Sequence, residues 1–382
     1  MGQQLLRRTT SRSTTTLAIA GVIGALGGFG GTPSTTEPVE TIEPIVAGEP
    51  ISDARCDANR DAGTITYLTG FDFAASAGMV DVFVAAERGY FDELCLDVEI
   101  QPSFSTSNYP LVASNEAQFA SAGSFSEVLS FAAANDADLV SLIVEGRTPI
   151  DALILKPDTA GTLEDLEGAT IGVRGKIPPS VAAMLASAGL LEGEDYETVL
   201  LDGFDPVAHI ALDGIVGFPG YKSNEPGALD RSDVAYDLFD PIDYDVPGSF
   251  GVVYTSAGFA EDHPTATQDF VRATMRGLAD ALADPAAAAE TAMALVTDGG
   301  NPNYLSAEGE AFRWETESAL IGDAYGDGEA FGVPNLDLLQ AEVDAYTEVG
   351  LVPDDVPELA DVADVDLIAS VYDDEQQVVW PG

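Results

Sequence analysis

Basic residues are scarce in this chain. Lysine and arginine together number 15, against 65 aspartates and glutamates in 382 residues, so the formal net charge at pH 7 is −50. A surface of this charge repels phosphate backbones and anionic lipid headgroups, which makes nucleic acid a poor partner. It also keeps a protein soluble in concentrated salt, where self-repulsion is screened. We interpret the acidity as an adaptation to salty surroundings and not as a binding site.

Residues that hold metals or perform catalysis are also scarce. The chain has two cysteines, Cys56 and Cys95, and two histidines, His209 and His263. They form no cluster with metal-site spacing, so no metal site is predicted. Both histidines are interpreted as ordinary surface residues. The sequence also lacks a nucleophile elbow, a P-loop and a dinucleotide glycine fingerprint, and it therefore predicts no cofactor.

The N-terminal segment differs from the rest of the chain. Residues 1–36 contain three arginines and no acid, and the apolar run at residues 17–31 is shorter than the roughly 20 residues of a spanning helix. This pattern is typical of a secretory signal peptide, and an uncleaved N-terminal anchor is the alternative. Residues 1–31 therefore predict export, to the periplasm or the extracellular space. Residues 32–63 begin with a stretch rich in Thr, Pro and Glu and are predicted to be a flexible linker.

Export bears on the two cysteines. Because exported proteins meet an oxidising environment, Cys56 and Cys95 are expected to form one disulfide. It would tie the segment before the first strand to the end of the first helix. Two buried free thiols are the alternative, since the sequence does not show the required Cβ geometry.

From residue 64 the chain alternates between strand and helix patterns, which predicts an α/β fold with mainly parallel sheets. One β/α block ends near residue 150, and a second ends with a return strand near residue 255. Helical spacing dominates the C-terminal part. We expect residues 64–150 and 255–382 to form lobe 1 and residues 151–254 to form lobe 2. A ligand cleft is then expected between the lobes, at the carboxyl ends of the strands.

Three segments carry a resemblance to a known family. They are "GMVDVFVAAERGYFDELCLDVEI" (78–100), "TLEDLEGATIGV" (162–173) and "GFPGYKSNEP" (217–226). In this order they resemble the NMT1/THI5-like substrate-binding proteins, also called SsuA/THI5-like. The resemblance implies a type II periplasmic-binding fold whose lobes close on a small solute. It further implies a monomeric, non-enzymatic protein that delivers the solute to an ABC permease.

The ligand implied by the resemblance is a small heteroaromatic solute, either a thiamine-pyrimidine precursor or a vitamin-like compound. Sulfonate or nitrate binding is an alternative on the same fold. A pyrimidine-synthesising enzyme branch is another alternative, but it carries a "CCCFC" run and an early substrate histidine that this sequence lacks.

The loops that follow the predicted strands supply the candidate ligand-binding residues. Aromatic rings can stack on a heteroaromatic ligand, and fixed polar groups can orient it. Several candidates also have a structural alternative: core packing for the two phenylalanines, helix capping for Ser105, Asn108 and Ser124, bonding to the local backbone for Asn224, and a solvated charge for the lysine. Ser124 is followed three residues later by Glu127, and this spacing also predicts a capping box at the start of a helix. The candidates are Phe71, Phe73, Ser105, Asn108, Tyr109, Ser124, Gly175, Lys176, Ser180, Tyr221, Asn224 and Glu225.

The stretch "GFPGYKSNEP" receives particular weight. Its glycines and Pro219 predict a turn after the strand "GIVGF" (214–218). Tyr221 can stack on a ring, and Glu225 can accept hydrogen bonds from ring or exocyclic N–H groups. The alternative is a structural turn in which Lys222 pairs with Glu225. We predict that Tyr221→Ala or Glu225→Gln lowers affinity by at least about tenfold and changes the melting temperature little.

Overall fold

The computed structural model describes residues 42–301, 305–326, 328–353 and 355–382. The predicted signal peptide or anchor at residues 1–31 lies outside these residues. The described chain from Ile42 to Gly382 forms one compact unit. Within it, no helix is both long and apolar enough to cross a membrane.

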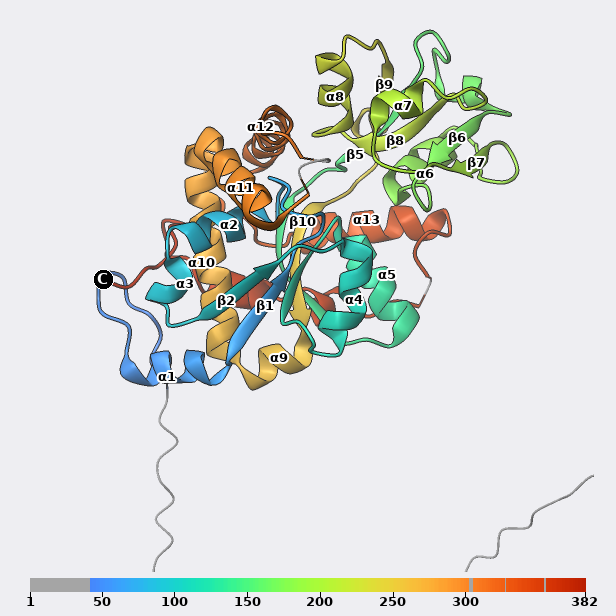
Figure 1. The fold of residues 1–382 in the computed structure, drawn as a ribbon. Helices are drawn as coiled ribbons and strands as arrows, with labels where there is room; N and C mark the ends of the chain where they lie inside the picture. Colours follow the sequence, from blue (N-terminus) through green and yellow to red (C-terminus); the bar gives the residue numbers. More distant parts are fainter. Residues whose placement is uncertain (1–41, 302–304, 327, 354) are drawn as a thin grey trace, which may run out of the picture. The chain divides into compact units, whose positions relative to one another are not determined.

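The first of two sheets has the strand order β2-β1-β3-β10-β4. Parallel pairing joins β1 to β2 and β3, whereas β10 pairs antiparallel with both β3 and β4. Strand β10 therefore runs against the other four, and Figure 1 shows it within a sheet built otherwise from the N-terminal strands. The strands are β1 (Thr64–Leu68), β2 (Asp97–Gln101), β3 (Phe119–Ala122), β4 (Leu139–Gly146) and β10 (Phe250–Ser256).

The second sheet has the order β7-β6-β8-β5-β9. Here β6 pairs parallel with β7 and β8, and β5 pairs antiparallel with β8 and β9. The prediction of a two-lobed α/β fold is confirmed, and each sheet is mixed because one strand is reversed. The strands are β5 (Asp151–Leu155), β6 (Thr170–Val173), β7 (Glu197–Leu200), β8 (Gly217–Tyr221) and β9 (Asp237–Phe239).

Helices surround both sheets. In the first lobe α10 packs against α2, and ring stacking of Phe119 on Phe270, with centroids 3.9 Å apart, joins β3 to α10. Trp314 of α12 is fully buried and donates to the Ala281 carbonyl, so it is a core residue of this lobe. Helices of the first lobe are α1 (Asp53–Asp61), α2 (Val80–Glu87), α3 (Tyr90–Glu93), α4 (Ser105–Ala113), α5 (Phe125–Asn135), α9 (Ala257–Asp262), α10 (Pro264–Ala283), α11 (Pro285–Gly299), α12 (Ala307–Ala324), α13 (Leu336–Glu348), α14 (Leu359–Val362) and α15 (Val365–Ala369). Those of the second lobe are η1 (Leu163–Leu166), α6 (Pro179–Ser187), α7 (Pro206–Ile210), α8 (Glu225–Arg231) and η2 (Pro241–Tyr244).

The prediction of a flexible linker at residues 32–63 is wrong for residues 53–61, which form α1. Ser52 caps this helix by accepting a hydrogen bond from the Arg55 amide. The Arg55 guanidinium is buried in an ion pair with Asp269 of α10, at 2.7 Å. A Thr/Pro/Glu-rich composition predicts a tether, but the buried ion pair and a covalent bond hold α1 on the first lobe.

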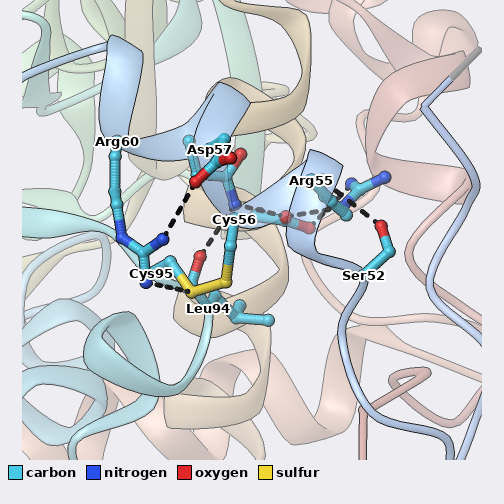
Figure 2. The surroundings of a disulfide bond; sticks show 9 residues. Ser52, Arg55, Cys56, Asp57, Arg60, Leu94 and Cys95 are labelled. Carbon is cyan, nitrogen blue, oxygen red and sulfur yellow. Dashed lines mark hydrogen bonds and ion pairs between the residues drawn. A yellow bond between two sulfur atoms is a disulfide. The ribbon is translucent and has the colours of Figure 1, made fainter. Parts of the chain in front are cut away.

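That covalent bond is the disulfide between Cys56 of α1 and Cys95, which follows α3 (Figure 2). Its Cα atoms lie 5.2 Å apart, within the usual range for a disulfide. The expected disulfide is therefore confirmed.

Two further expectations are wrong. "GFPGY" is not a turn, because it forms β8 and pairs with β5. Proline lacks the backbone N–H that a strand donates to its neighbour. Pro219 is tolerated in β8 because β8 pairs with β6 only at Gly217, so β6 requires no hydrogen bond from residue 219. A Cβ atom on Gly217 would lie 2.1 Å from the Ile154 carbonyl oxygen, so only glycine allows β8 and β5 to approach this closely. His209 is 5% exposed and packs edge-on against Phe218, so it is not a surface residue.

Candidate ligand-binding site

A cavity of about 420 Å³ lies between the two lobes. Its walls come from the segments after β1, β2 and β3, the start of β5, the loops after β6 and β7, the turn from β8 into α8, and the start of β10. Residues of α12 and α13 complete it. The cavity lies where the sequence predicts a cleft, because the loops after neighbouring parallel strands emerge at one edge of each sheet.

Eight of the twelve predicted site residues line this cavity, and four do not. The lining residues come from both lobes, so a ligand held there would touch each of them. They are Phe71, Ser105, Ser124, Lys176, Ser180, Tyr221, Asn224 and Glu225.

Phe73 belongs to the core of the first lobe. It is 5% exposed and packs edge-on against Phe83 of α2. Phe71, two residues earlier, faces the cavity instead. The turn between them contains Asp72 in a left-handed conformation, with φ of 47°. That turn separates the two rings, and the prediction for Phe73 is wrong.

The other three residues have structural contacts. Asn108 is fully buried; its side-chain oxygen accepts a hydrogen bond from the Ser103 hydroxyl, and its side-chain amide donates one to the Thr69 carbonyl. Tyr109 stacks on Tyr254, and its hydroxyl donates to Glu127 at 3.4 Å. Gly175 has φ of +97°, which favours glycine and explains its place in the turn after β6. None of the three is a lining residue.

The turn from β8 into α8 is built around Glu225. Its carboxylate accepts from the Tyr221 amide at 2.8 Å and from Arg174 at 2.9 Å, and the residue is only 3% exposed. Lys222 instead pairs with Asp240 at 3.0 Å, so the alternative pairing of Lys222 with Glu225 is wrong. Glu225 thus fixes the backbone that presents Tyr221 to the cavity.

The same turn contacts the first lobe directly. Arg313 of α12 donates to the side-chain oxygen of Asn224 at 2.8 Å. Ser223 donates to the Glu317 carboxylate of α12 at 2.6 Å. Glu317 also accepts from the backbone amide of Ala77, after β1. These buried contacts join the two lobes at one wall of the cavity.

Aromatic rings from both lobes meet at another wall. Phe71 lies edge-on to Phe104, with centroids 5.6 Å apart, and edge-on to Phe204 of the second lobe at 5.4 Å. The guanidinium of Arg174 lies over the Phe204 ring at 5.0 Å. A flat ligand at this wall would meet apolar ring surface.

Among the charged side chains of the lining, acids outnumber cations. Glu127, Asp151, Glu225 and Glu317 face the cavity together with three cations, Arg174, Lys176 and Arg313. Arg174 is paired with Glu225, and Arg313 with Glu310 at 3.0 Å.

Their protonation reflects the buried setting. Burial, then the neighbouring Glu127 carboxylate, raises the pKa of Asp151 to about 7. Burial also raises the pKa of Glu127, although the charge of Lys176 opposes this shift. Burial raises the pKa of Glu317, against hydrogen bonds from Ser223 and Ala77.

The local structure explains how Glu127 reaches the cavity. Ser124 caps α5 by accepting from the Glu127 amide, as the capping pattern predicts. A Cβ atom on Gly123 would lie 2.9 Å from a Glu127 carboxylate oxygen and 3.1 Å from the Tyr221 hydroxyl. Side chains of the two lobes therefore converge at Gly123.

Sequence reasoning missed Asp151, Glu317, Arg174, Arg313, Phe104 and Phe204 as lining residues. A chain with 65 acids gives no local signal for the few that face a cavity. Arg174 was detectable, because it sits between a predicted strand and the candidates Gly175 and Lys176. Among the described residues, no group of three or more His, Cys, Asp and Glu is placed to hold a metal ion.

Known proteins resemble this chain over most of its length. A family model described as NMT1/THI5 like matches residues 77–288. The riboflavin-binding protein RibY of Chloroflexus aurantiacus is 26% identical over 276 residues, which cover 69% of this chain and 76% of RibY. The formylaminopyrimidine-binding protein of Halalkalibacterium halodurans is 31% identical over 238 residues, covering 59% of this chain and 69% of that protein.

Solved structures share the fold. The periplasmic aliphatic sulphonate-binding protein SsuA of Escherichia coli superimposes with a TM-score of 0.59 at 15% identity, covering 78% of this chain and 91% of SsuA. The desulfurization enzyme DszB superimposes with a TM-score of 0.53 at 14% identity, covering 80% of this chain and 97% of DszB. At such identities the likeness shows the fold and does not extend to the ligand or the activity.

Proposed function

The chain belongs to the NMT1/THI5-like family, and from this premise we propose that it is the solute-binding protein of an ABC importer. Its ligand is a small heteroaromatic compound that carries N–H groups, held in the cavity between the lobes. Binding joins the lobes and shifts the equilibrium between open and closed forms toward the closed one. The closed, loaded protein then delivers the solute to a permease.

One observation carries the choice of ligand class: the cavity combines aromatic rings with more carboxylates than cations. Phe71 and Tyr221 offer ring surface, and Glu127 and Asp151 offer acceptors. Ring faces stack on a flat heterocycle, and carboxylates accept hydrogen bonds from its ring or exocyclic N–H groups. The two curated relatives are named for a flavin and a formylaminopyrimidine, which are both nitrogen heterocycles.

The same observation disfavours sulfonate and nitrate. An anion would need donors at the cavity wall, but Arg174 and Arg313 are already paired with Glu225 and Glu310, which leaves Lys176 as the remaining lining cation. Asp151 and Glu317 would repel a second negative charge in this buried setting. An anionic ligand is therefore the weaker candidate on this fold.

An enzymatic role is the other alternative, and we propose that the chain has none. The pyrimidine-synthesising branch uses a histidine of its own chain as substrate. His209 is buried against Phe218, and neither histidine lines the cavity. The curated relatives are named as binding proteins. Iron- and pyridoxal-dependent turnover by the purified protein would revive the enzymatic alternative.

We also propose an exported monomer. The family relationship and the disulfide fit an oxidising compartment outside the cytoplasm. A permease gene beside the gene for this chain would support transport over a sensing role. Light scattering would identify an oligomer.

Thermal-shift screening tests the ligand class. Selective ligands stabilise the folded protein by mass action, so melting temperature rises with ligand concentration. We expect aminopyrimidines or flavins to raise it, and ethanesulfonate and nitrate to leave it unchanged at equal ionic strength. A shift with ethanesulfonate alone would replace the heteroaromatic proposal with sulfonate binding.

A further inference from the structure

Asp151 and Glu127 face the cavity from different lobes. Asp151 is the first residue of β5, where the chain enters the second lobe, and Glu127 lies in the first turn of α5 in the first lobe. Both are half-buried, and both line the cavity. We propose that this carboxylate pair selects a ligand that carries a positive charge, and that the charge bridges the two lobes. This inference rests on the proposed function and specifies its ligand.

The charges of the cavity support this selection. Glu225 is matched by Arg174, and Arg313 is matched by Glu310. Glu317 is stabilised by hydrogen bonds from Ser76, Ala77 and Ser223. Lys176 then remains as the one lining cation against Glu127 and Asp151. When both carboxyl groups are ionised, the uncompensated charge is negative, and a monocation in the cavity would balance it.

The hydrogen bonds of the two acids leave acceptor capacity for a ligand. Asp151 accepts from the Ser180 hydroxyl at 3.1 Å. Glu127 accepts from the Tyr109 hydroxyl at 3.4 Å, a long contact. A carboxylate offers about four acceptor positions, so each group can take an ammonium or amidinium N–H as well. Hydrogen bonds between charged groups are stronger than neutral ones, particularly away from water.

Mutual repulsion gives the pair its selectivity. Closing the lobes brings two carboxyl groups into one buried space, which favours the protonated form of at least one. Burial and the Glu127 charge accordingly raise the pKa of Asp151 to about 7. A cationic ligand would remove this cost of closure, whereas a neutral one of the same shape would remove only part of it.

Other ionisable groups also act on Asp151, and none of them replaces the ligand charge. Glu225 raises its pKa, and Lys222 lowers it from a position paired with Asp240. Tyr221 and Tyr346 border the same space, but burial raises the pKa of both phenols, so they stay neutral near pH 7.

Two pyrimidines differing in one group provide the test. 4-Amino-5-aminomethyl-2-methylpyrimidine carries an ammonium arm, and 4-amino-5-hydroxymethyl-2-methylpyrimidine carries a neutral hydroxymethyl arm. Titration calorimetry with the wild-type protein should show about tenfold tighter binding of the ammonium compound. In Asp151→Asn or Glu127→Gln this preference should fall below about threefold. Asp262→Asn, on the exposed end of α9, is the control and should keep the preference.

The pH dependence provides a second readout, and its sign follows from Asp151. Its ionised fraction rises between pH 6 and pH 8, while an aliphatic ammonium keeps its charge over this range. Affinity for the ammonium compound should therefore increase with pH in the wild type and lose this dependence in Asp151→Asn.

Equal affinities for the two compounds in the wild-type protein would overturn the inference and leave the proposed function standing. Failure of both compounds to bind, together with binding of ethanesulfonate, would overturn the proposed function as well. A tenfold preference that survives in Asp151→Asn and Glu127→Gln, with both variants folded, would also overturn the assignment to this pair.

Discussion

Glu225 has two roles that the sequence does not separate. It lines the cavity, and it holds the Tyr221 amide and the Arg174 guanidinium from a nearly buried position. A glutamine at position 225 would place its own N–H group against either the Tyr221 amide or the Arg174 guanidinium, and one of these two donors would lose its acceptor. We now expect Glu225→Gln to lower affinity about tenfold and stability by about 1–3 kcal/mol. The sequence alone predicted little effect on melting temperature.

Calorimetry and thermal denaturation of Glu225→Gln check both effects. Glu261→Gln, exposed on α9, is the matched control and should change neither. A variant with wild-type affinity would remove Glu225 from the site, whatever its stability.

Asp81 shows how a buried acid limits stability at high pH. It is fully buried on α2 next to Glu145 of β4, and burial raises its pKa to about 6. Because the folded pKa exceeds the ordinary aspartate pKa of about 3.8, the native state disfavours the ionised form. This cost is complete above about pH 6 and absent below about pH 4.

Asp81→Asn should therefore raise the melting temperature at pH 8 and change it much less at pH 4. Thermal denaturation at the two pH values measures this difference. Destabilisation of Asp81→Asn at pH 8 would show that the ionised carboxylate is favourable in the native state.

The neighbouring residues Phe71 and Phe73 show what sequence reasoning can resolve about a site. Both are aromatic residues in the loop after β1, and only the left-handed turn at Asp72 decides which one faces the cavity. Tyr221, Asn224 and Glu225 were predicted because they follow a strand and carry the family motif. Asp151 and Glu317 were not, since among 65 acids only the tertiary packing selects those that reach the cavity.

At the scale of elements, α1 belongs to the first lobe although the sequence around it predicts a flexible linker. Its sequence has the helix start signal, Ser52 followed by Asp53, but it lacks an apolar stripe. The α1 helix relies on polar burial, with Arg55 and Asn59 both bonded to Asp269. Sequence patterns that weigh apolar spacing therefore miss it, whereas they located most strands of the β/α blocks.

The disulfide should contribute strongly to this arrangement. It closes a loop of 39 residues in sequence, for which the chain-entropy model gives about 4 kcal/mol as an upper value. The double variant Cys56→Ser/Cys95→Ser should unfold at lower denaturant concentration by an amount equal to about 2–4 kcal/mol.

Thiol titration of the denatured, unreduced protein complements that measurement. It should detect no free thiol, because Cys56 and Cys95 are the only cysteines in the chain. Two titratable thiols in protein purified from its oxidising compartment would contradict the disulfide.

At the scale of the whole molecule, the net charge of −50 should make stability depend on salt. Self-repulsion in the compact state is screened within about 3 Å at 1 M salt and extends about 30 Å at 0.01 M. Melting temperature should rise steadily from low to high sodium chloride. Lowering the pH from about 8 to about 5 should also raise it, because buried acids such as Asp81 and Asp151 take up protons there.

A melting temperature independent of salt would mean that the acidic surface does not destabilise the folded state. In that case the salt-adaptation interpretation fails, while the fold and the site are unaffected.

Titration calorimetry of the wild-type protein tests the central claim, that the cavity between the lobes binds a nitrogen heterocycle. The injected compounds are 4-amino-5-aminomethyl-2-methylpyrimidine, riboflavin and ethanesulfonate at equal ionic strength. We predict saturable binding of one of the two heterocycles with a single site, and no heat of binding from ethanesulfonate. Saturable binding of ethanesulfonate, with neither heterocycle bound, would contradict the claim.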